Sequence, residues 1–313
     1  MVESRLREAL TATRIARAIG AHNALGGQLV ESAGFDAVWV SGLEVSAAAG
    51  VPDANILSMS EVVAAGASIA ARTTVPVLAD CDSGFGNSNN VEHLVEECER
   101  AGMAGICIED KMFPKLNSFA GGRQNLESRE TFAAKILAGT FARKSKDFLV
   151  VARTEALIAG AGMDEAVHRA YLYERAGADA LLVHSKLKTP DEVVEFRRRY
   201  TGELPLILVP TTYYATSAAE FESLGFAMVI YANHLLRAAI TAMRHVLQTI
   251  DERGSTESLE EEIATIQDIF RLQRLPEMLA RREDFETRGK DLLAAENFRP
   301  PLTGDSGHPI VGR

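Results

Sequence analysis

The sequence predicts an α/β protein built as a closed (β/α)8 barrel of the TIM type, followed by a helical appendage. Three observations predict this fold. Short apolar runs alternate with amphipathic stretches from about Ile15 to Arg253, about eight such runs occur, and most of them follow an Ala-Gly or Gly signal that ends a helix. A length of 313 residues fits one such barrel or two small domains. An open dinucleotide-binding sheet fits less well, because no G-x-G-x-x-G follows the first apolar run.

The predicted strands are short and apolar throughout, which is typical of parallel strands buried on both faces. In chain order they are Ile15–Ala21, Ala37–Ser41, Val75–Ala79, Ala104–Ile108, Phe148–Ala152, Ala180–Val183, Leu204–Val209 and Ala227–Tyr231.

The stretches between these strands carry apolar residues at helical spacing, so we predict helices there. They include Ser58–Arg72, Asn90–Arg100, Arg129–Arg143, Asp164–Arg175 and Thr189–Tyr200. Several contain a side chain that can cap the first turn of a helix, namely Ser60, Asn90, Ser128 and Asp191.

The character of the sequence changes after Gly254, so we expect three parts: a barrel over residues 1–254, C-terminal helices over 255–297 and a tail over 298–313. Ser258–Arg282 is dense in charge but keeps apolar residues at helical spacing. Two interpretations stay open for these helices: they pack on their own barrel, or they exchange with a second subunit. The last part is rich in Pro and Gly and is expected to be flexible.

Composition excludes several classes of partner. Lys and Arg number 33 against 43 Asp and Glu, so the formal net charge of −10 disfavours nucleic acid and anionic membranes. The chain has no run of 18 uncharged apolar residues and begins without the apolar core of a signal peptide. Three irregularly spaced cysteines predict neither a disulfide framework nor a zinc site. We therefore expect a cytoplasmic protein that acts on a small molecule.

The polar residues that end the apolar runs are the candidates for function, because a barrel of this type builds its active site at the C-terminal ends of its strands. In chain order they are His22-Asn23, Ser41-Gly42, Asp80 and Asp82, Glu109-Asp110-Lys111, Arg153, His184-Ser185-Lys186, Thr211-Thr212 and Asn233-His234.

Asp80, Asp82 and Glu109 would place three carboxylates on one side of the barrel mouth. Like charges at such separations need a cation, and hard oxygen ligands without Cys or paired His favour Mg²⁺, with Mn²⁺ as an alternative. Each carboxylate taken alone also fits a helix cap or an ion pair. Asp110 follows Glu109 directly and would point elsewhere, so we expect a mainly structural role for it.

Arg153 and His184 end strands across the mouth from the acidic group and fit an anionic oxygen of a ligand. The polar, Gly-rich segment from Lys111 to Arg123 fits a lid with Gly121-Gly122 as its hinge, which would deliver Lys115, Asn117 and Ser118 to a substrate. The alternative interpretation is a mobile surface loop.

Glu109-Asp110-Lys111, five further residues and then Asn117-Ser118 resemble the E-D-K-x5-N-S signature of the phosphoenolpyruvate mutase family, within the isocitrate lyase/phosphoenolpyruvate mutase superfamily. The resemblance covers roughly residues 5 to 290. It also includes Trp39-Val40-Ser41-Gly42-Leu43, the stretch from Asp80 to Asn87, Val151–Ala156, His184-Ser185-Lys186 and Tyr231–His234. Lyases of the superfamily carry a K-K-C-G-H type loop, whereas this chain has Lys115-Leu116-Asn117-Ser118 without a cysteine.

The resemblance implies the reversible rearrangement of phosphoenolpyruvate to 3-phosphonopyruvate, the P–C bond-forming entry to phosphonate biosynthesis, in a homodimer or homotetramer with swapped helices. It implies Mg²⁺ held directly by Asp80, with Asp82 and Glu109 acting through water. The substrate contacts that it implies are Trp39, Ser41, Gly42, Leu43, Asn117, Ser118, Arg153 and His184, and the catalytic set is Asp53 beside the migrating group, Lys115 as a latch of the lid, Asn117, Arg153 and His184.

Two alternatives remain. A phosphonopyruvate hydrolase would share nearly all of these residues, and Val51–Ser58 resembles the hydrolases at least as well as the mutases. Asn117 favours the mutase, because the hydrolases tend to depart from Asn at this position of the lid. A barrel that binds a ligand without turning it over is the second alternative.

Overall fold

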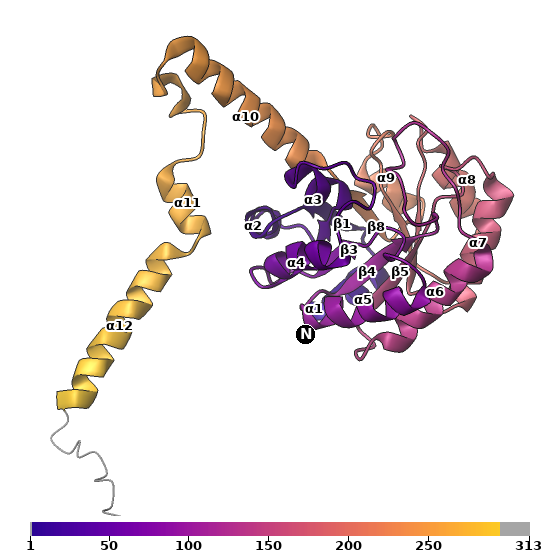
Figure 1. Cartoon of the computed structure of the whole chain (residues 1–313), viewed down its shortest axis with the longest axis horizontal. Coiled ribbons are helices and arrows are strands. Elements are labelled where there is room, and N and C mark those ends of the chain that lie inside the picture. The colour runs from indigo at the N-terminus through magenta and orange to yellow at the C-terminus, as the bar shows by residue number, and fades with distance from the viewer. Residues whose placement is uncertain (1, 295–313) are drawn as a thin grey trace, which may run out of the picture. The chain divides into compact units, whose positions relative to one another are not determined.

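A computed structural model describes residues 2–294 of the chain. Eight parallel strands close into a barrel in chain order, with β8 paired to β1 (Figure 1). This confirms the predicted (β/α)8 fold, and every predicted strand overlaps an observed one. The strands are β1 (Ala16–Ala21), β2 (Ala37–Val40), β3 (Val77–Asp80), β4 (Gly105–Glu109), β5 (Leu149–Thr154), β6 (Ala180–Val183), β7 (Leu206–Leu208) and β8 (Met228–Tyr231).

Helices surround the barrel and follow its strands (Figure 1). They are α2 (Ala24–Ser32), α3 (Gly42–Ala48), α4 (Met59–Ala70), α5 (Ser88–Arg100), α6 (Arg129–Ala142), α7 (Met163–Arg175), α8 (Asp191–Arg199) and α9 (Ala218–Ser223).

Only one of the four predicted caps is the residue that caps its helix. Ser128 accepts a hydrogen bond from the backbone of Thr131 and begins α6 as predicted. The predictions of Ser60 and Asn90 were wrong, because Ser58 caps α4 and Asn87 caps α5, each with a reciprocal contact from the residue three positions on. Asp191 is the first residue of α8, and the preceding Pro190 makes no side-chain cap.

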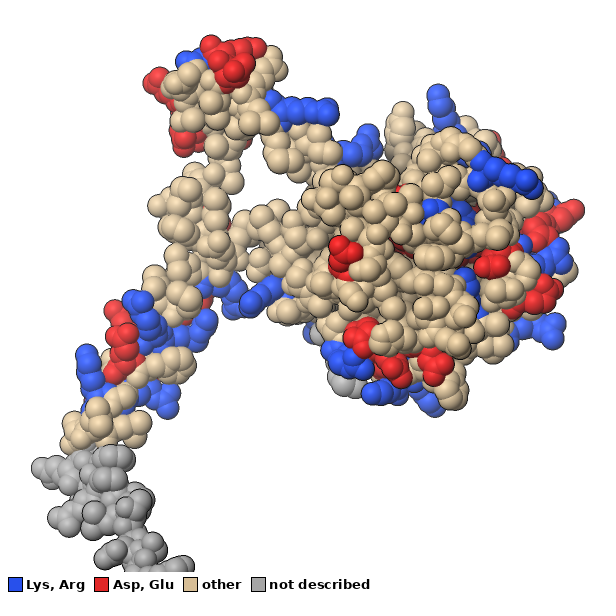
Figure 2. Space-filling model, in the orientation of Figure 1, with Lys and Arg blue, Asp and Glu red and all other residues tan. Residues whose placement is uncertain are grey.

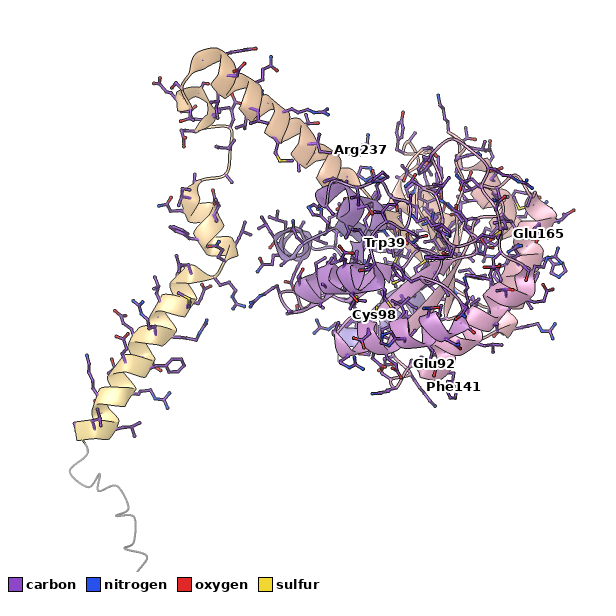
Figure 3. The ribbon with its side chains drawn as sticks, viewed as in Figure 1. Trp39, Glu92, Cys98, Phe141, Glu165 and Arg237 are labelled. Atoms are coloured by element: carbon purple, nitrogen blue, oxygen red, sulfur yellow. The ribbon has the colours of Figure 1, made fainter. Side chains whose placement is uncertain are left out.

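The apolar core has two layers, one between the strands and the helices and one inside the barrel. The inner layer contains Trp39, which lies among the strands in Figure 3. It also contains Leu6 and Leu10 from α1 (Val2–Thr11), a helix that the sequence analysis did not predict. Arg5 donates to the carbonyl of Thr74, just before β3, which places α1 at the end where the strands begin. The end at which the strands finish is not covered by α1 and is available for a functional site.

Four further elements follow β8 within the described residues: α10 (His234–Arg253), a 3-10 turn (Glu257–Leu259), α11 (Ile266–Leu272) and α12 (Leu275–Ala294). The chain divides into two compact units at 245/246, inside α10, whereas the sequence analysis placed the boundary at 254. Helices within the predicted range 255–297 are present, while the predicted tail over 298–313 lies outside the described residues.

The surface of the barrel mixes both signs of charge, with Lys and Arg interspersed among Asp and Glu on the face in Figure 2. Among residues 2–294, no helix has the length and apolar character needed to cross a membrane.

Candidate active site

One cavity of about 50 Å³ lies where the strands end, and most of the predicted site residues line it. The predicted residues in its wall are Trp39, Ser41, Leu43, Asp53, Asp80, Lys115, Asn117, Ser118, Arg153 and His184. Its remaining wall residues are Phe119, Val209, Thr211, Ala232 and Asn233. Side chains from six of the eight strand ends and from two connecting loops therefore meet at one point, as the (β/α)8 topology requires.

Gly42, Asp82 and Glu109 lie just outside this wall. A methyl group on Gly42 would fall 3.3 Å from Asp82 Oδ1 and 3.5 Å from Asp80 Oδ2, so two carboxylate oxygens face the same small space. Ser41 caps α3, and the missing side chain at Gly42 leaves room for that approach. Asp82 has a φ of 51°, a left-handed conformation that Asp tolerates better than most residues and that turns its carboxylate back toward the strand end.

The carboxylates of this acidic group are strongly perturbed. Burial raises the pKa of Asp80, with Glu109 and Asp53 adding to the effect against Arg153 and Lys115. Burial also raises the pKa of Asp82 to about 7, although Lys115 opposes it. Crowded acids of this kind gain from a cation between them.

The donor set fits a hydrated magnesium ion. Asp82 Oδ1 and Glu109 Oε1 are buried and have no hydrogen-bond partner within the described residues, although Lys115 Nζ lies 2.9 Å from Asp82 Oδ1 in an ion pair. No group of three or more His, Cys, Asp or Glu side chains in the described part of the chain is placed to enclose a metal by itself. Mg²⁺ commonly takes only one or two carboxylates and keeps several waters. Asp80 and Asp82 beside Gly42 fit that mode of binding.

The predicted lid, residues 111–123 (the lid segment), is fastened at the cavity by Asp53. Lys115 Nζ lies 2.6 Å from Asp53 Oδ1, and Asn117 Nδ2 donates to Asp53 Oδ2 at 2.6 Å. The backbone N–H of Asn117 donates to the Asp53 carbonyl at 3.1 Å. Burial acts to raise the pKa of Asp53, but the charge and hydrogen bond of Lys115 and the amide of Asn117 lower it overall. Asp53 is therefore an ionised anchor for the lid.

Asn55 completes this fastening, and the sequence analysis did not single it out. Its Nδ2 donates to Asp82 Oδ2 at 2.6 Å, and its Oδ1 accepts the backbone N–H of Lys115 at 2.6 Å. Its φ of 54° is left-handed, a conformation in which Asn is enriched. In the sequence, the only indication that Asn55 belongs to the site is its position two residues after Asp53.

Arg153 and His184 come together as predicted, around a third residue that was not predicted to belong to the site. Arg153 Nη2 lies 2.9 Å from His184 Nδ1, and Arg153 Nε lies 3.2 Å from Glu109 Oε2. Glu155 accepts from Arg153 Nε at 2.7 Å, and its Oε1 lies 2.8 Å from His184 Nδ1. Burial lowers the pKa of His184, so the imidazole is neutral near pH 7.

Lys111 and Ser118 join this cluster from the lid segment. Lys111 Nζ donates to the Leu116 carbonyl at 2.7 Å and to Ser118 Oγ at 2.9 Å, and it lies 3.4 Å from both Glu109 Oε1 and Glu155 Oε2. Ser118 Oγ donates to Glu155 Oε2 at 2.5 Å. The lid segment is therefore fastened at two points, by Asp53 and by Glu155.

Asp110 has the structural surroundings that were expected for it. Its buried carboxylate accepts from the backbone of Glu155 at 2.7 Å, from Tyr173 Oη at 2.7 Å and from Arg169 Nη1 at 3.1 Å. These bonds join β4, β5 and α7 on the side of the strands away from the cavity, because successive residues of a strand face opposite ways.

Comparison with known proteins places these residues in context. The family described as phosphoenolpyruvate phosphomutase matches residues 6–251. The phosphonopyruvate hydrolase of Variovorax sp. (strain Pal2) is 46% identical over 270 residues, 86% of this chain and 93% of that protein. The phosphoenolpyruvate phosphomutase of Tetrahymena pyriformis is 44% identical over 254 residues, 81% of this chain and 85% of that protein.

Two solved structures are similar over nearly their whole length. A phosphoenolpyruvate phosphomutase from Streptomyces platensis subsp. rosaceus has a TM-score of 0.90 at 47% identity, covering 91% of this chain and 99% of that one. A phosphonopyruvate hydrolase in complex with oxalate and Mg²⁺ has a TM-score of 0.85 at 44% identity, covering 90% of this chain and 98% of that one.

Proposed function

The chain belongs to the phosphoenolpyruvate phosphomutase family, in the isocitrate lyase/phosphoenolpyruvate mutase superfamily, and within that family we propose that it interconverts phosphoenolpyruvate and 3-phosphonopyruvate. In this rearrangement the bond between phosphorus and the enol oxygen breaks and a bond between phosphorus and C3 of the same pyruvate unit forms. The phosphoryl group must be held beside a pyruvate enolate and kept away from water while it moves.

One observation carries the proposal: the lid segment is fastened over a small cavity by Asp53, through both Lys115 and Asn117. Lys115 is only 6% exposed, so its ammonium group stays inside the closed site. Asn117 lines the cavity with an amide that Asp53 orients.

Each group has a distinct task in the proposed reaction. Arg153 supplies a fixed positive charge, and together with His184 it would bind the phosphoryl oxygens. Ser41 and Leu43, at the start of α3, line the cavity and would contact the pyruvate part of the substrate. We propose Mg²⁺ as the cofactor, held by Asp80, with Asp82 and Glu109 beside it. When bound, it would supply Lewis-acid stabilisation of negative charge on the pyruvate oxygens.

A second candidate is phosphonopyruvate hydrolase, favoured by the 46% identity to the Variovorax enzyme. In that reaction water attacks phosphorus, and phosphate and pyruvate are released. Lyase relatives are less relevant, because the three cysteines, Cys81, Cys98 and Cys107, are all buried and none lies in the lid segment.

The deciding experiment follows phosphonopyruvate with Mg²⁺ by ³¹P NMR. Phosphoenolpyruvate as the main product supports the mutase, and stoichiometric phosphate with pyruvate refutes it in favour of the hydrolase. Protein that shows neither turnover nor Mg²⁺-dependent binding of oxalate, a mimic of the pyruvate enolate, would refute both enzymatic proposals.

We also propose that the C-terminal helices associate with a second copy of the chain. Taken by itself, α12 buries none of its residues, and its exposed apolar side chains include Met278, Phe285 and Leu292. Light scattering with size-exclusion chromatography should give a dimer or tetramer for the wild type and a smaller particle for Phe285→Glu. An unchanged mass for that variant would refute the role of this face.

A further inference from the structure

Glu155 is a buried carboxylate that contacts both the Arg153–His184 pair and the lid segment. It follows β5 directly, is 0% exposed, and contacts four polar side chains with its two oxygens. Oε1 accepts from Arg153 Nε at 2.7 Å and lies 2.8 Å from His184 Nδ1. Oε2 accepts from Ser118 Oγ at 2.5 Å and lies 3.4 Å from Lys111 Nζ. One oxygen therefore faces the two phosphoryl-binding residues and the other faces the lid segment.

The Ser118 hydroxyl is fully engaged by the protein. A hydroxyl has one proton to donate and accepts about two hydrogen bonds. Ser118 Oγ donates to Glu155 and accepts from Lys111 Nζ at 2.9 Å and from Arg153 Nη2 at 3.1 Å. In this closed arrangement the hydroxyl has no capacity left for a ligand. Its contribution is to connect the lid segment to Glu155 and Arg153.

His184 Nδ1 lies between a hydrogen-bond donor and a hydrogen-bond acceptor. Arg153 Nη2, at 2.9 Å, can only donate, whereas an ionised Glu155, at 2.8 Å, can only accept. Burial acts to raise the pKa of Glu155, but Arg153, His184 and Lys111 hold it well below its usual range. Both contacts involve an ionised partner, so Nδ1 is held between the Arg153 guanidinium and the Glu155 carboxylate. His184 Nε2 is buried and has no hydrogen-bond partner among the described residues.

We propose that Glu155 is a positioning residue that couples closure of the lid segment to the orientation of Arg153 and His184. This inference rests on the proposed function. When Ser118 reaches Glu155, the same carboxylate holds the Arg153 guanidinium and the His184 ring in place. The phosphoryl group is therefore held only when water is excluded.

The coupling determines the fate of phosphonopyruvate. In the rearrangement the P–C bond breaks and a P–O bond forms to the enol oxygen of the same molecule. In the competing reaction the oxygen of a water molecule bonds to phosphorus, one of its protons ends on C3, and pyruvate and phosphate are released. Weakening the connection between Glu155 and the lid segment should raise the share of the second reaction.

The test compares Glu155→Gln with the wild type and with Glu195→Gln, which makes the same change at a partly exposed residue of α8 that pairs with Arg198 on the same helix. For Glu155→Gln we expect kcat to fall by about tenfold to a hundredfold with KM within about threefold, because misorientation affects the transition state more than binding. We also expect the phosphate share of the product, measured by ³¹P NMR, to rise several-fold. Glu195→Gln should match the wild type in kcat, in KM and in the phosphate share of the product.

A spectroscopic measurement makes the test independent of turnover. The ¹⁵N shifts of His184, assigned by their loss in His184→Asn, should differ between the wild type and Glu155→Gln, because the variant replaces the ionised carboxylate beside Nδ1 with a neutral amide. If Glu155→Gln does not fold, Ser118→Ala takes its place in the product assay, because it removes the same connection from a lid residue outside the barrel core. It too should raise the phosphate share.

Wild-type product partition and unchanged His184 ¹⁵N shifts in these variants would overturn the proposal. A uniform loss of activity without a change in product share would assign Glu155 a purely structural role and overturn it as well. Failure of the proposed function is distinguishable, because it appears in the wild type itself as phosphate instead of phosphoenolpyruvate.

Discussion

Gly42→Ala is the sharpest test of the cation site, because the structure gives the position of the added atom. The new methyl carbon would lie 3.3 Å from Asp82 Oδ1, 3.5 Å from Asp80 Oδ2 and 3.6 Å from Asp80 Cγ. It would occupy the space that both carboxylates face. Gly42 begins α3 with an ordinary negative φ, so its backbone accepts alanine without strain. The change in the free energy of unfolding should stay within about 1 kcal/mol.

Unlike the stability, the Mg²⁺-dependent affinity for oxalate should change strongly. Displacing a cation or one of its waters should weaken Mg²⁺-dependent oxalate binding at least about tenfold, equivalent to about 1.4 kcal/mol. Isothermal titration calorimetry at fixed Mg²⁺ measures the affinity, and urea denaturation measures the stability. Oxalate affinity in Gly42→Ala equal to that of the wild type would refute the placement of the cation beside Gly42.

Three further predictions concern stability. Asp110→Asn should lower the free energy of unfolding by about 1.5 to 3 kcal/mol in urea, because it removes a charged acceptor from the buried Arg169 guanidinium, which keeps its contact with Glu165; a loss below about 1 kcal/mol would contradict this. Hydrogen bonding from Arg129 lowers the pKa of Glu165 to about 2, so its stabilisation is complete above about pH 4.5 and is lost as the pH falls toward 2. Glu165→Gln should flatten the pH dependence of Tm over that interval, and parallel curves would count against it. Leu6→Ala should cost about 2 to 5 kcal/mol in the same urea assay, because Leu6 is fully buried in the barrel interior, and a neutral result would show that α1 is dispensable.

The barrel was predictable from the sequence because each strand is marked by residues that are neighbours along the chain. Each strand is a short apolar run between turn signals, and eight such runs at regular spacing leave few alternatives. Helix boundaries were less predictable. Ser58 and Ser60 are both suitable caps by residue type, and the choice between them depends on which one Glu61 reaches back to bond. α1 was missed because its apolar contribution rests on Leu6 and Leu10, too few positions for a clear period.

The site was predictable where polarity marks the end of a strand, and less so where a residue acts through its neighbours. Asp80, Arg153 and His184 line the cavity as the strand-end rule predicted. Glu155 carried a signal that was not used: it lies two residues after Arg153, so the two side chains leave the strand on the same side. The sequence around Asn55 carried almost no signal of its role, because that role depends on a loop that meets the lid segment only in the folded chain.

The charge balance of the site explains why a divalent cation suits it. Within the described residues, the cavity and its immediate surroundings hold the carboxylates of Asp53, Asp80, Asp82, Glu109 and Glu155 against the cations Lys111, Lys115 and Arg153. Five negative charges against three positive ones leave an excess of two. Burial raises the pKa of Asp82 to about 7, and the neighbouring carboxylates add to that rise. A substrate that carries a carboxylate and a phosphoryl group would add to the repulsion. A divalent ion cancels this excess, whereas protonation of Asp82 removes only half of it and also removes a donor that the ion requires.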